Sequence, residues 1–392
     1  MISLEWVKDY IDISDQDLEE LAVKITQSGI NVEKVITNHI NNLVIGEVLE
    51  CVAHPDSDHL HVCKVNIGNI TELIVCGAPN VREGLKVIVA LPGAVLPGDF
   101  EIKKSKIRGV ESNGMLCALY ELGLEEKNDE TYAKGIEELG ADAPVGEDPL
   151  KYLGLDDTLY ELDIHKHRNN DCYYHIGFAY EIGAILNRPV TLPDLSFKED
   201  QNNVENYFTL DVETEKCPFY LAKMVKNAKI GESPEFIKKR LLAAGMRPIN
   251  NVVDISNYVM LEFGQPLHFF DKNRLGNHIL VRDAKDKEEV ITLDGKRRIL
   301  SSNDIVITDG NRPVCIAGVM GGENTEVEQD TTDILIEAAI FDPVSIRYTA
   351  ANLDLRSEAS IRYGKGLSYE YTEMALKRAC HLLEKYAGAT IL

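Results

Sequence analysis

The spacing of hydrophobic residues near the start of the chain predicts an amphipathic helix. Apolar side chains recur at intervals of three and four residues and so share one helical face: Leu18, Leu21, Ala22 and Ile25. Ser14 is the predicted N-cap, with Asp17 three residues later in the position of a capping box. Gly29 can take the left-handed conformation that ends a helix.

From Leu43 onward the apolar period changes to two, which is typical of half-buried strands. Turns rich in Pro, Gly, Asn and Asp separate the apolar stretches. The predicted strands are Leu43–Val52, Leu60–Ile67, Glu72–Cys76 and Lys86–Leu91. Short strands at this spacing predict a small closed barrel. The pattern fades near Gly123, and we expect the acidic stretch 125–148 to be an irregular exit from the barrel.

The rest of the chain mixes both periods. A predicted strand at Tyr160–Ile164 is followed by a helix over 174–186, which Asn187-Arg188-Pro189 ends. Residues 194–206 are polar and are interpreted as a linker. The second half combines predicted helices with predicted strands: 234–244, 369–386, 279–283, 289–292, 304–308 and 334–338. Together these segments predict an α+β multidomain protein.

Length and charge narrow the possibilities. A chain of 392 residues is expected to form two to four domains, and it has no apolar run of the ~20 residues that span a membrane. The formal net charge is −23, from 41 basic and 64 acidic residues, which disfavours nucleic-acid binding outside a local basic surface. Lys103, Lys104, Lys106 and Arg108 provide one such surface, although a solvated charged edge is the alternative interpretation.

Cysteine and histidine usage bears on compartment and metal binding. Eight scattered cysteines without a Cys-x-x-Cys pair, and a charged start, predict reduced thiols in a cytoplasmic protein. His59, His61 and Cys63 alternate along one predicted strand, a spacing that can hold zinc with His54 as a fourth ligand. Ordinary strand histidines are the alternative, and we predict no metal site.

Residues 44–124 resemble a known tRNA-binding domain. The resemblance rests on these segments: His54-Pro55-Asp56-Ser57-Asp58, 62–65, 74–82, 90–94 and 106–117. They are similar to the OB-fold domain at the front of bacterial phenylalanyl-tRNA synthetase beta subunits. The resemblance implies a barrel whose basic edge contacts tRNA by shape and backbone, with these contact residues: Lys103, Lys104, Lys106, Arg108 and Asn113. One departure is visible at 118–123, which lacks the serine and lysine of a common family segment.

Residues 245–366 carry a second resemblance, to the editing domain of the same beta subunit. It rests on these segments: 245–261, 264–268, 316–322, Glu337 and 355–360. That domain hydrolyses tyrosine wrongly attached to tRNA(Phe). By resemblance, His268 and Glu337 are the catalytic pair that recognises the tyrosine. The implied substrate-binding residues either leave room for the ring or supply polar lining: Ala317, Gly318, Ala359, Ser256, Asn257 and Ser357.

Physical chemistry explains why such a second site is needed. An apolar pocket that accepts phenylalanine rejects tyrosine poorly, because tyrosine only adds a hydroxyl. A site with buried hydrogen-bond partners for that hydroxyl disfavours phenylalanine, which leaves each partner unpaired at a cost of ~1–3 kcal/mol. No Ser-His-Asp arrangement is evident in the sequence. We therefore expect an ordered water and the terminal tRNA hydroxyl to carry out hydrolysis.

The resemblance also implies a domain layout. Residues 1–39 with 151–193 form a small N-terminal α/β domain, into which the OB-fold β-barrel of 40–150 is inserted. A mixed α+β editing domain occupies 207–392. Only about the first half of the family's subunit is covered, so we expect this shortened chain to bind no cofactor. ATP, Mg2+ and the alpha subunit are expected for the full enzyme, with no membrane partner.

Two departures keep a non-catalytic alternative open. Gly364 stands where relatives commonly have glutamate, and His165-Lys166-His167-Arg168 replaces a common Thr-Pro-Asn-Arg segment. The first hypothesis is a hydrolytic editing enzyme that acts on Tyr-tRNA(Phe). The alternative is a tRNA-binding and assembly module with a vestigial editing pocket.

Overall fold

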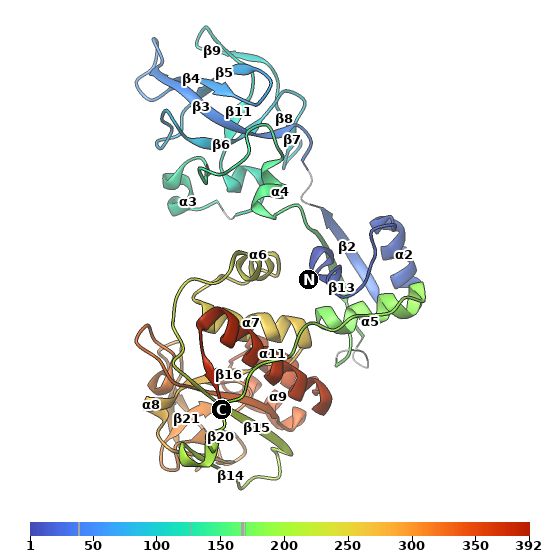
Figure 1. The fold of residues 1–392 in the computed structure, drawn as a ribbon, viewed down its shortest axis with the longest axis vertical. Helices are drawn as coiled ribbons and strands as arrows, with labels where there is room; N and C mark the ends of the chain where they lie inside the picture. The colour runs from blue at the N-terminus through green and yellow to red at the C-terminus, as the bar shows by residue number, and fades with distance from the viewer. Residues whose placement is uncertain (38–39, 126, 166–167, 169) are drawn as a thin grey trace. The chain divides into compact units, whose positions relative to one another are not determined.

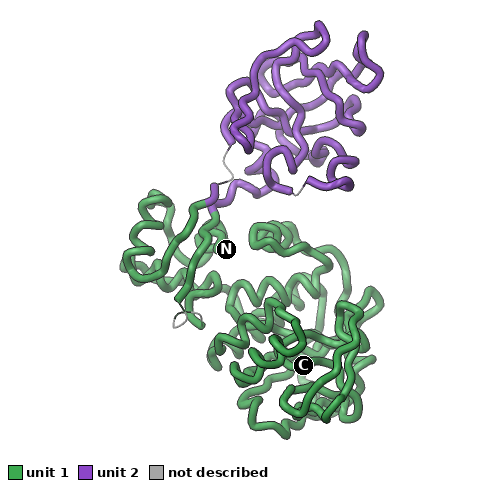
Figure 2. Tube along the Cα trace, turned by 180° about the vertical axis from the view of Figure 1, so that it is seen from behind, with its two compact units in different colours: residues 1–35, 159–392 green, residues 36–158 purple. Residues whose placement is uncertain are grey.

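The computed structural model describes residues 1–37, 40–125, 127–165, 168 and 170–392. Lys166 and His167, in the departure noted above, lie outside the described residues. The chain divides into two compact units (Figure 2). Unit 1 comprises Met1–Val35 and Leu159–Leu392, and unit 2 comprises Ile36–Thr158. The division into three domains that we expect from the sequence remains a prediction.

Unit 2 is built on an antiparallel six-stranded sheet. Its order is β11-β6-β3-β4-β5, and β12 also pairs with β6. The strands are β3 (Leu43–Ala53), β4 (His61–Asn66), β5 (Thr71–Cys76), β6 (Lys86–Ala90), β11 (Met115–Cys117) and β12 (Glu138–Leu139). The four strands predicted from alternation are thus confirmed as β3 to β6. β3 pairs with both β4 and β6, and a register shift between Val48 and Glu50 lets this long strand bend in a half-barrel sheet.

Short elements complete unit 2: β7 (Val95–Leu96), β8 (Phe100–Glu101), β9 (Ser105–Ile107), β10 (Val110–Ser112), η1 (Leu119–Leu122), α3 (Asp129–Lys134) and α4 (Pro149–Leu153). The prediction of an irregular segment at 125–148 was wrong, because it contains α3 and β12. Asn128 caps α3 by accepting hydrogen bonds from the amides of Glu130 and Thr131. Acidic residues in the first turn also favour the helix N-terminus electrostatically.

The N-terminal part of unit 1 has a three-stranded sheet of order β1-β13-β2. Its elements are β1 (Ile2–Ser3), α1 (Leu4–Val7), α2 (Leu18–Ser28), β2 (Asn31–Thr37), β13 (Thr158–Asp163) and α5 (His175–Leu186). α2 confirms the predicted helix and its end at Gly29, where φ is 115°. The predicted cap was wrong. Asp17 accepts the hydrogen bond from the Glu20 amide, whereas Ser14 donates its hydroxyl to Asp12.

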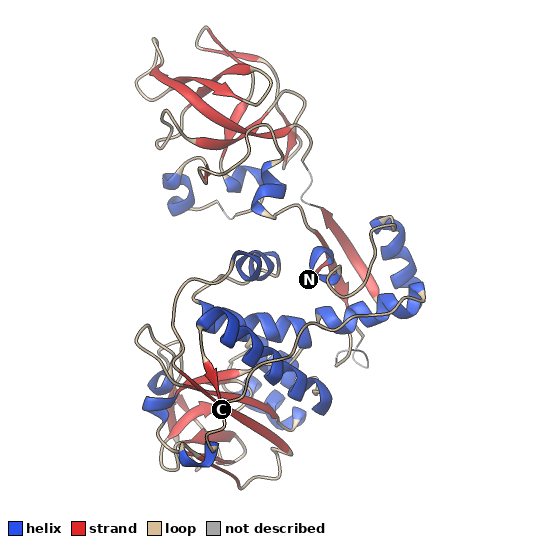
Figure 3. Ribbon diagram, viewed as in Figure 1, coloured by secondary structure: helices blue, strands red, loops and turns tan. Residues whose placement is uncertain are grey.

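The larger part of unit 1 places helices around two sheets (Figures 1 and 3). One sheet has the order β14-β17-β20-β21-β22 and the other the order β16-β23-β15-β24, while β18 and β19 form a separate two-stranded sheet. The strands are β14 (Thr209–Val212), β15 (Phe219–Lys226), β16 (His268–Asp271), β17 (His278–Asp283), β18 (Glu289–Ile291), β19 (Arg297–Ile299), β20 (Ile305–Thr308), β21 (Pro313–Ile316), β22 (Met320–Gly321), β23 (Ile334–Ile340) and β24 (Thr390–Ile391). The expected mixed α+β class is confirmed.

The helices of this part are α6 (Glu235–Ala243), α7 (Asn251–Phe263), α8 (Lys272–Leu275), α9 (Pro343–Asn352), α10 (Glu358–Tyr363) and α11 (Tyr369–Ala387), with 3-10 turns η3 (Val204–Asn206) and η4 (Glu323–Thr325). The segment interpreted as a linker, 194–206, is not free of the core. Leu195 and Phe197 pack against the main apolar cluster, and Arg378 donates a hydrogen bond to the carbonyl of Asp194. Among the described residues, no helix has the length and hydropathy to cross a membrane.

Candidate functional site

His268 and Glu337 lie directly opposite each other on neighbouring strands. β16 and β23 run antiparallel, and the register pairs His268 with Glu337. Cross-strand partners project from the same face of a sheet, so both side chains point to one side. β23 is buried at all seven of its positions, which fixes the direction of the Glu337 side chain. The structure therefore brings the two predicted catalytic residues together.

Both side chains line one pocket of about 60 Å³. Its walls come from β16 and the segment before it, the turn between β21 and β22, β23, and α10. The lining residues are Pro266, Leu267, His268, Cys315, Gly318, Val319, Met320, Gly321, Glu337, Ala359 and Tyr363. Gly318 and Ala359 of the predicted substrate-binding set are among them.

The other predicted substrate-binding residues do not line this pocket. Ala317 is buried in the neighbouring core, and Asn257 is half-buried on α7. The Ser256 hydroxyl donates to the Leu267 carbonyl over 3.0 Å, so it supports the wall from behind. Ser357 caps α10 and donates to the Val319 carbonyl over 2.6 Å, which ties that helix to the glycine turn.

Glu337 is a buried carboxyl group with one hydrogen-bond partner among the described residues. The Tyr220 hydroxyl donates to Glu337 Oε2 over 2.7 Å. Tyr220 lies on β15 opposite Ala339, two residues along β23 from Glu337, and therefore on the same face. Burial raises the pKa of Glu337 to about 7, and the Tyr220 hydrogen bond opposes that rise. Glu337 is thus close to changing its protonation state at neutral pH.

The His268 ring is held by packing. Its Nε2 atom is shielded from solvent and has no hydrogen-bond partner among the described residues. Burial lowers the pKa of His268 to about 4, so the imidazole is neutral at pH 7. Phe270 contacts it edge-on, with ring centroids 4.3 Å apart. A Cβ at Gly321 would lie 2.3 Å from His268 Cε1, so only glycine at this position leaves room for the ring.

The structure adds pocket residues that the sequence did not indicate. Tyr363 lines the pocket, Tyr220 contacts it through its hydrogen bond to Glu337, and Gln265 donates to the Ala339 carbonyl over 3.0 Å behind the wall. Gly318 has a φ of 66°, and a Cβ there would lie 2.9 Å from Ile346 Cδ1. Tyr220 stands 117 residues before Glu337 in the chain, and apolar alternation carries no information on that pairing.

The predicted tRNA-binding residues form an exposed basic edge in unit 2. Lys103, Lys104, Lys106 and Arg108 are all exposed, around the β9–β10 hairpin. Two of these charges are compensated, because Lys103 lies 2.8 Å from Glu101 and Lys106 lies 3.9 Å from Glu111. Arg108 donates to the Asp56 carbonyl, and Asn113 donates to Glu72.

Two of the residues considered for zinc, His54 and Cys63, are engaged otherwise. His54 Nε2 lies 3.1 Å from the Ile107 carbonyl oxygen, and its Nδ1 accepts from the Asp56 amide. Cys63 is fully buried, with its Sγ 3.8 Å from that of Cys51. Within the part of the chain that the structure describes, no three His, Cys, Asp or Glu side chains cluster so as to hold a metal ion.

Comparison with protein families places these features in known modules. A family model described as "Putative tRNA binding domain" matches residues 43–148. A second, described as "B3/4 domain", matches residues 216–388 and so includes the pocket. The two matches define the class as a multidomain chain that combines a tRNA-binding domain with a B3/4 domain.

Similar proteins identify the family within this class. Phenylalanine–tRNA ligase beta subunits from Geobacillus kaustophilus and Bacillus cereus are 48% and 47% identical to the whole of this chain, which covers 49% of each of them. The chain belongs to the phenylalanine–tRNA ligase beta-subunit family and spans about half the length of these relatives. An N-terminal fragment of the Pyrococcus horikoshii phenylalanyl-tRNA synthetase beta subunit aligns with a TM-score of 0.34 at 14% identity, covering 60% of this chain and 63% of the fragment. That TM-score is too low to indicate a shared fold.

Proposed function

We propose that the pocket at His268 and Glu337 hydrolyses the ester bond of tyrosine wrongly attached to tRNA(Phe). The observation that carries this proposal is the pairing, in one small pocket, of the buried Glu337 carboxyl group with the shielded Nε2 of half-buried His268. Glu337 has a second carboxyl oxygen that Tyr220 does not engage, and His268 has an unpartnered Nε2. Both groups gain if a ligand brings a phenol hydroxyl to them.

The same pairing disfavours phenylalanine. A phenylalanine ring in this pocket would displace water while leaving the Glu337 oxygen and His268 Nε2 unsatisfied. Each buried group left without a partner costs ~1–3 kcal/mol. Gly318 and Ala359 give the pocket wall small side chains, and Gly318 cannot carry a side chain without striking Ile346. The pocket thus selects for the hydroxyl that the synthetic site tolerates.

Hydrolysis in this proposal needs no covalent nucleophile. Cys315 lines the pocket, but burial raises the pKa of its thiol well above the ordinary value, so it stays protonated. The serines nearest the pocket, Ser256 and Ser357, donate their hydroxyl groups to backbone carbonyls. An ordered water attacks the already activated ester, and the terminal hydroxyl of the tRNA assists. The protein positions these groups.

Unit 2 completes the proposal by binding tRNA. Its half-barrel sheet is proposed to follow the OB-fold arrangement, with Lys103, Lys104, Lys106, Arg108 and Asn113 at the RNA backbone. The domain layout given above is proposed with it. The whole protein is proposed to be a cytoplasmic enzyme that pairs with an alpha subunit to charge tRNA(Phe) using ATP and Mg2+.

A deacylation assay tests the proposal. The purified chain is incubated with tRNA(Phe) carrying radiolabelled tyrosine, and release of tyrosine is followed beside H268A and E337A. Losing one buried hydrogen bond costs ~1–3 kcal/mol. Each variant should therefore release tyrosine about 10- to 100-fold more slowly than the wild type. H278A and E289A are the matched controls, because both residues lie outside the pocket, and they keep the wild-type rate. A tyrosyl ester trapped on serine or cysteine would contradict the water mechanism.

A specific observation supports the second candidate, a tRNA-binding and assembly module with a vestigial pocket. Tyr220 already occupies one oxygen of Glu337, so the protein partly satisfies its own carboxyl group. In that case the wild-type chain would bind tRNA(Phe) while tyrosine is released no faster than in buffer. The same assay, run with a filter-binding measurement, separates the two candidates.

A further inference from the structure

A second cavity, of about 490 Å³ and open to solvent, lies in unit 1 between α9 and α10. The chain that connects these helices forms its floor. The cavity is lined by Arg347, Ala350, Ala351, Asp354, Leu355, Arg356, Ser360, Ile361, Gly364 and Lys365. We name this cavity the α9–α10 cleft. None of its lining residues belongs to the pocket at His268 and Glu337.

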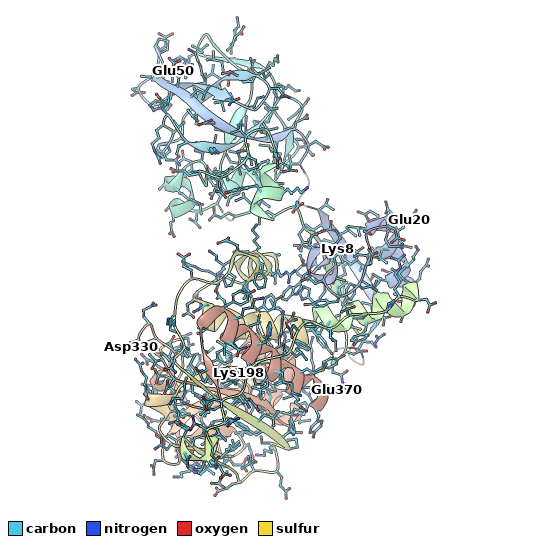
Figure 4. The ribbon with its side chains drawn as sticks, viewed as in Figure 1. Lys8, Glu20, Glu50, Lys198, Asp330 and Glu370 are labelled. Carbon is cyan, nitrogen blue, oxygen red and sulfur yellow. The ribbon has the colours of Figure 1, made fainter. Side chains whose placement is uncertain are left out.

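The α9–α10 cleft is positively charged on a strongly acidic protein. Three cations line it against one acid: Arg347, Arg356 and Lys365 against Asp354. The chain as a whole carries −23, and acidic side chains such as Glu20, Asp330 and Glu370 are exposed elsewhere on its surface (Figure 4). Crowding of like charge is evident at Lys365, whose pKa is lowered by burial and by the nearby Arg362 and Arg356.

The two arginines have charge to offer a ligand. Arg347 and Arg356 are both exposed, and neither has an ion-pair partner among the residues that the structure describes. The Arg347 guanidinium donates to the Gly364 carbonyl, which holds its stem across the cleft. The Lys365 ammonium lies 3.5 Å from the centroid of the Tyr173 ring, so this lysine contributes mainly by its stem and its long-range field.

One short helix separates the cleft from the pocket. Ala359 and Tyr363 of α10 line the pocket, while Ser360 and Gly364, the residues that follow each of them, line the cleft. Since a helix with its side chains is ~10 Å across, the two cavities are about one helix diameter apart. A linear ligand whose end enters the pocket can therefore place the part that precedes this end in the cleft.

We propose that the α9–α10 cleft binds backbone phosphates of the unpaired 3′ end of the RNA whose terminal ester occupies the pocket. This inference rests on the proposed function and specifies where its substrate is held. Guanidinium groups match phosphate oxygens with two parallel hydrogen bonds, and such contacts fix register without reading sequence. The cleft thus acts as the guide that presents the ester to His268 and Glu337.

Gly364 keeps the cleft open for this role. A Cβ at position 364 would lie 2.9 Å from Arg347 Cγ and 2.9 Å from the Ser360 carbonyl oxygen. A side chain there would push Arg347 off the backbone, and a carboxylate would also cancel part of the positive charge. Gly364 is therefore a sensitive position at which to test the cleft without touching the pocket.

The test uses the full chain with uncharged tRNA(Phe) and with its tyrosyl ester. Hydroxyl-radical footprinting maps protection of the 3′ strand, and filter binding over a salt series gives the slope of log K against log salt. The variants are R356E, R356Q and G364E. Of these, R356Q removes the charge and keeps the approximate size of the side chain. K377E on α11 is the matched control for charge reversal, and circular dichroism verifies the fold of each protein.

The expected result is loss of 3′-strand protection in R356E and G364E, and a weaker loss in R356Q. Each lost phosphate contact lowers the salt slope by about 1. For the tyrosyl ester, KM rises about tenfold while kcat changes little, because the pocket is intact; K377E behaves as the wild type. If the folded Arg356 variants keep the wild-type footprint and KM while deacylation is still active, the proposal that the cleft binds phosphates is rejected. The proposed function would then stand. A footprint that depends on Arg356 in a chain that releases no tyrosine would keep the cleft and reject the proposed function.

Discussion

Tyr220 and Glu337 share a hydrogen bond whose phenol oxygen lies 2.7 Å from Glu337 Oε2. The bond has two consequences for the pocket. It orients the carboxyl group so that the other oxygen is available to a ligand. It also stabilises the carboxylate against the burial that raises the pKa of Glu337 to about 7. Tyr220 is therefore a positioning residue for the recognition proposed above.

Replacing Tyr220 by phenylalanine should alter the pH dependence of deacylation. The hydrogen bond lowers the pKa of Glu337, so its loss in Y220F raises that pKa further above about 7. Less carboxylate is then present at pH 7 to accept the substrate hydroxyl, and the acid limb of the rate profile moves to higher pH. We expect a rate about tenfold lower at pH 7, from roughly 1.4 kcal/mol of lost stabilisation, with recovery at pH 9.

The measurement is the pH profile of kcat/KM for tyrosine release between pH 5 and 9, in steps of about half a unit. Y369F is the matched control, because Tyr369 is exposed and lies outside the pocket. An acid limb at the same pH in Y220F and in the wild type would show that the bond does not tune Glu337.

Glu337 also makes stability depend on pH. Its folded-state pKa of about 7 is above the ordinary 4.5, so the folded protein holds this proton more tightly than the unfolded chain does. The corresponding stabilisation is present below pH ~4.5 and is lost as pH rises through 7. E337Q cannot ionise, and it should be roughly 3 kcal/mol more stable than the wild type at pH 8.

That advantage should shrink as the pH falls to 5, since residue 337 is then largely neutral in the folded state of both proteins. Urea unfolding of the two proteins at pH 5 and 8, followed by tryptophan fluorescence and circular dichroism, checks the difference. An equal stability gap at both values would mean that residue 337 affects packing and not proton binding.

At the scale of elements, a buried ion pair holds the helices that deliver β16 to the site. Glu262 near the end of α7 is fully buried and accepts from Arg378 of α11 over 2.9 Å and from the Tyr10 hydroxyl over 2.5 Å. Gly264 then turns the chain with a φ of 77°, and a Cβ there would strike the Tyr174 ring. Since β16 begins four residues later, this network anchors the chain that leads to His268.

The elements show which parts of the structure the sequence could predict. Alternation and turn residues located β3 to β6 within two residues, although β6 is buried at four consecutive positions and does not alternate. Capping chemistry was ambiguous between Ser14 and Asp17, and the choice depended on a turn in which Asp12 engages Ser14. Segment 125–148 looked irregular because its helix is only six residues long.

The site was less accessible to pattern reasoning. His268 and Glu337 are 69 residues apart, and their pairing depends on the register of β16 against β23. Only the family resemblance connected them, and it gave no sign of Tyr220 on β15. The α9–α10 cleft was equally hidden, because Arg347 and Arg356 come together only when the two helices pack.

At the scale of the whole molecule, the two units have separate hydrophobic cores. Two apolar clusters lie wholly within residues 36–158. One is centred on Val48, Val65 and Val87, and the other on Ile88, Ala90 and Leu150. The first packs inside the half-barrel sheet, and the second covers the opposite side of β6 and includes α4. A unit with its own core of this kind is expected to fold without the rest of the chain.

Residues 36–158 expressed alone should therefore unfold in one cooperative thermal transition. A shorter fragment, 43–148, is the informative control, because it keeps the sheet and removes α4. Leu150 of α4 is 1% exposed, so its loss uncovers Ile88 and Ala90. Removing one buried leucine costs about 2–5 kcal/mol, and the shorter fragment should melt well below the longer one. Thermal melts followed by circular dichroism measure the melting temperatures of the two fragments. If the longer fragment shows no cooperative transition, the stability of unit 2 depends on residues outside it; equal melting temperatures would show instead that α4 adds nothing to the core.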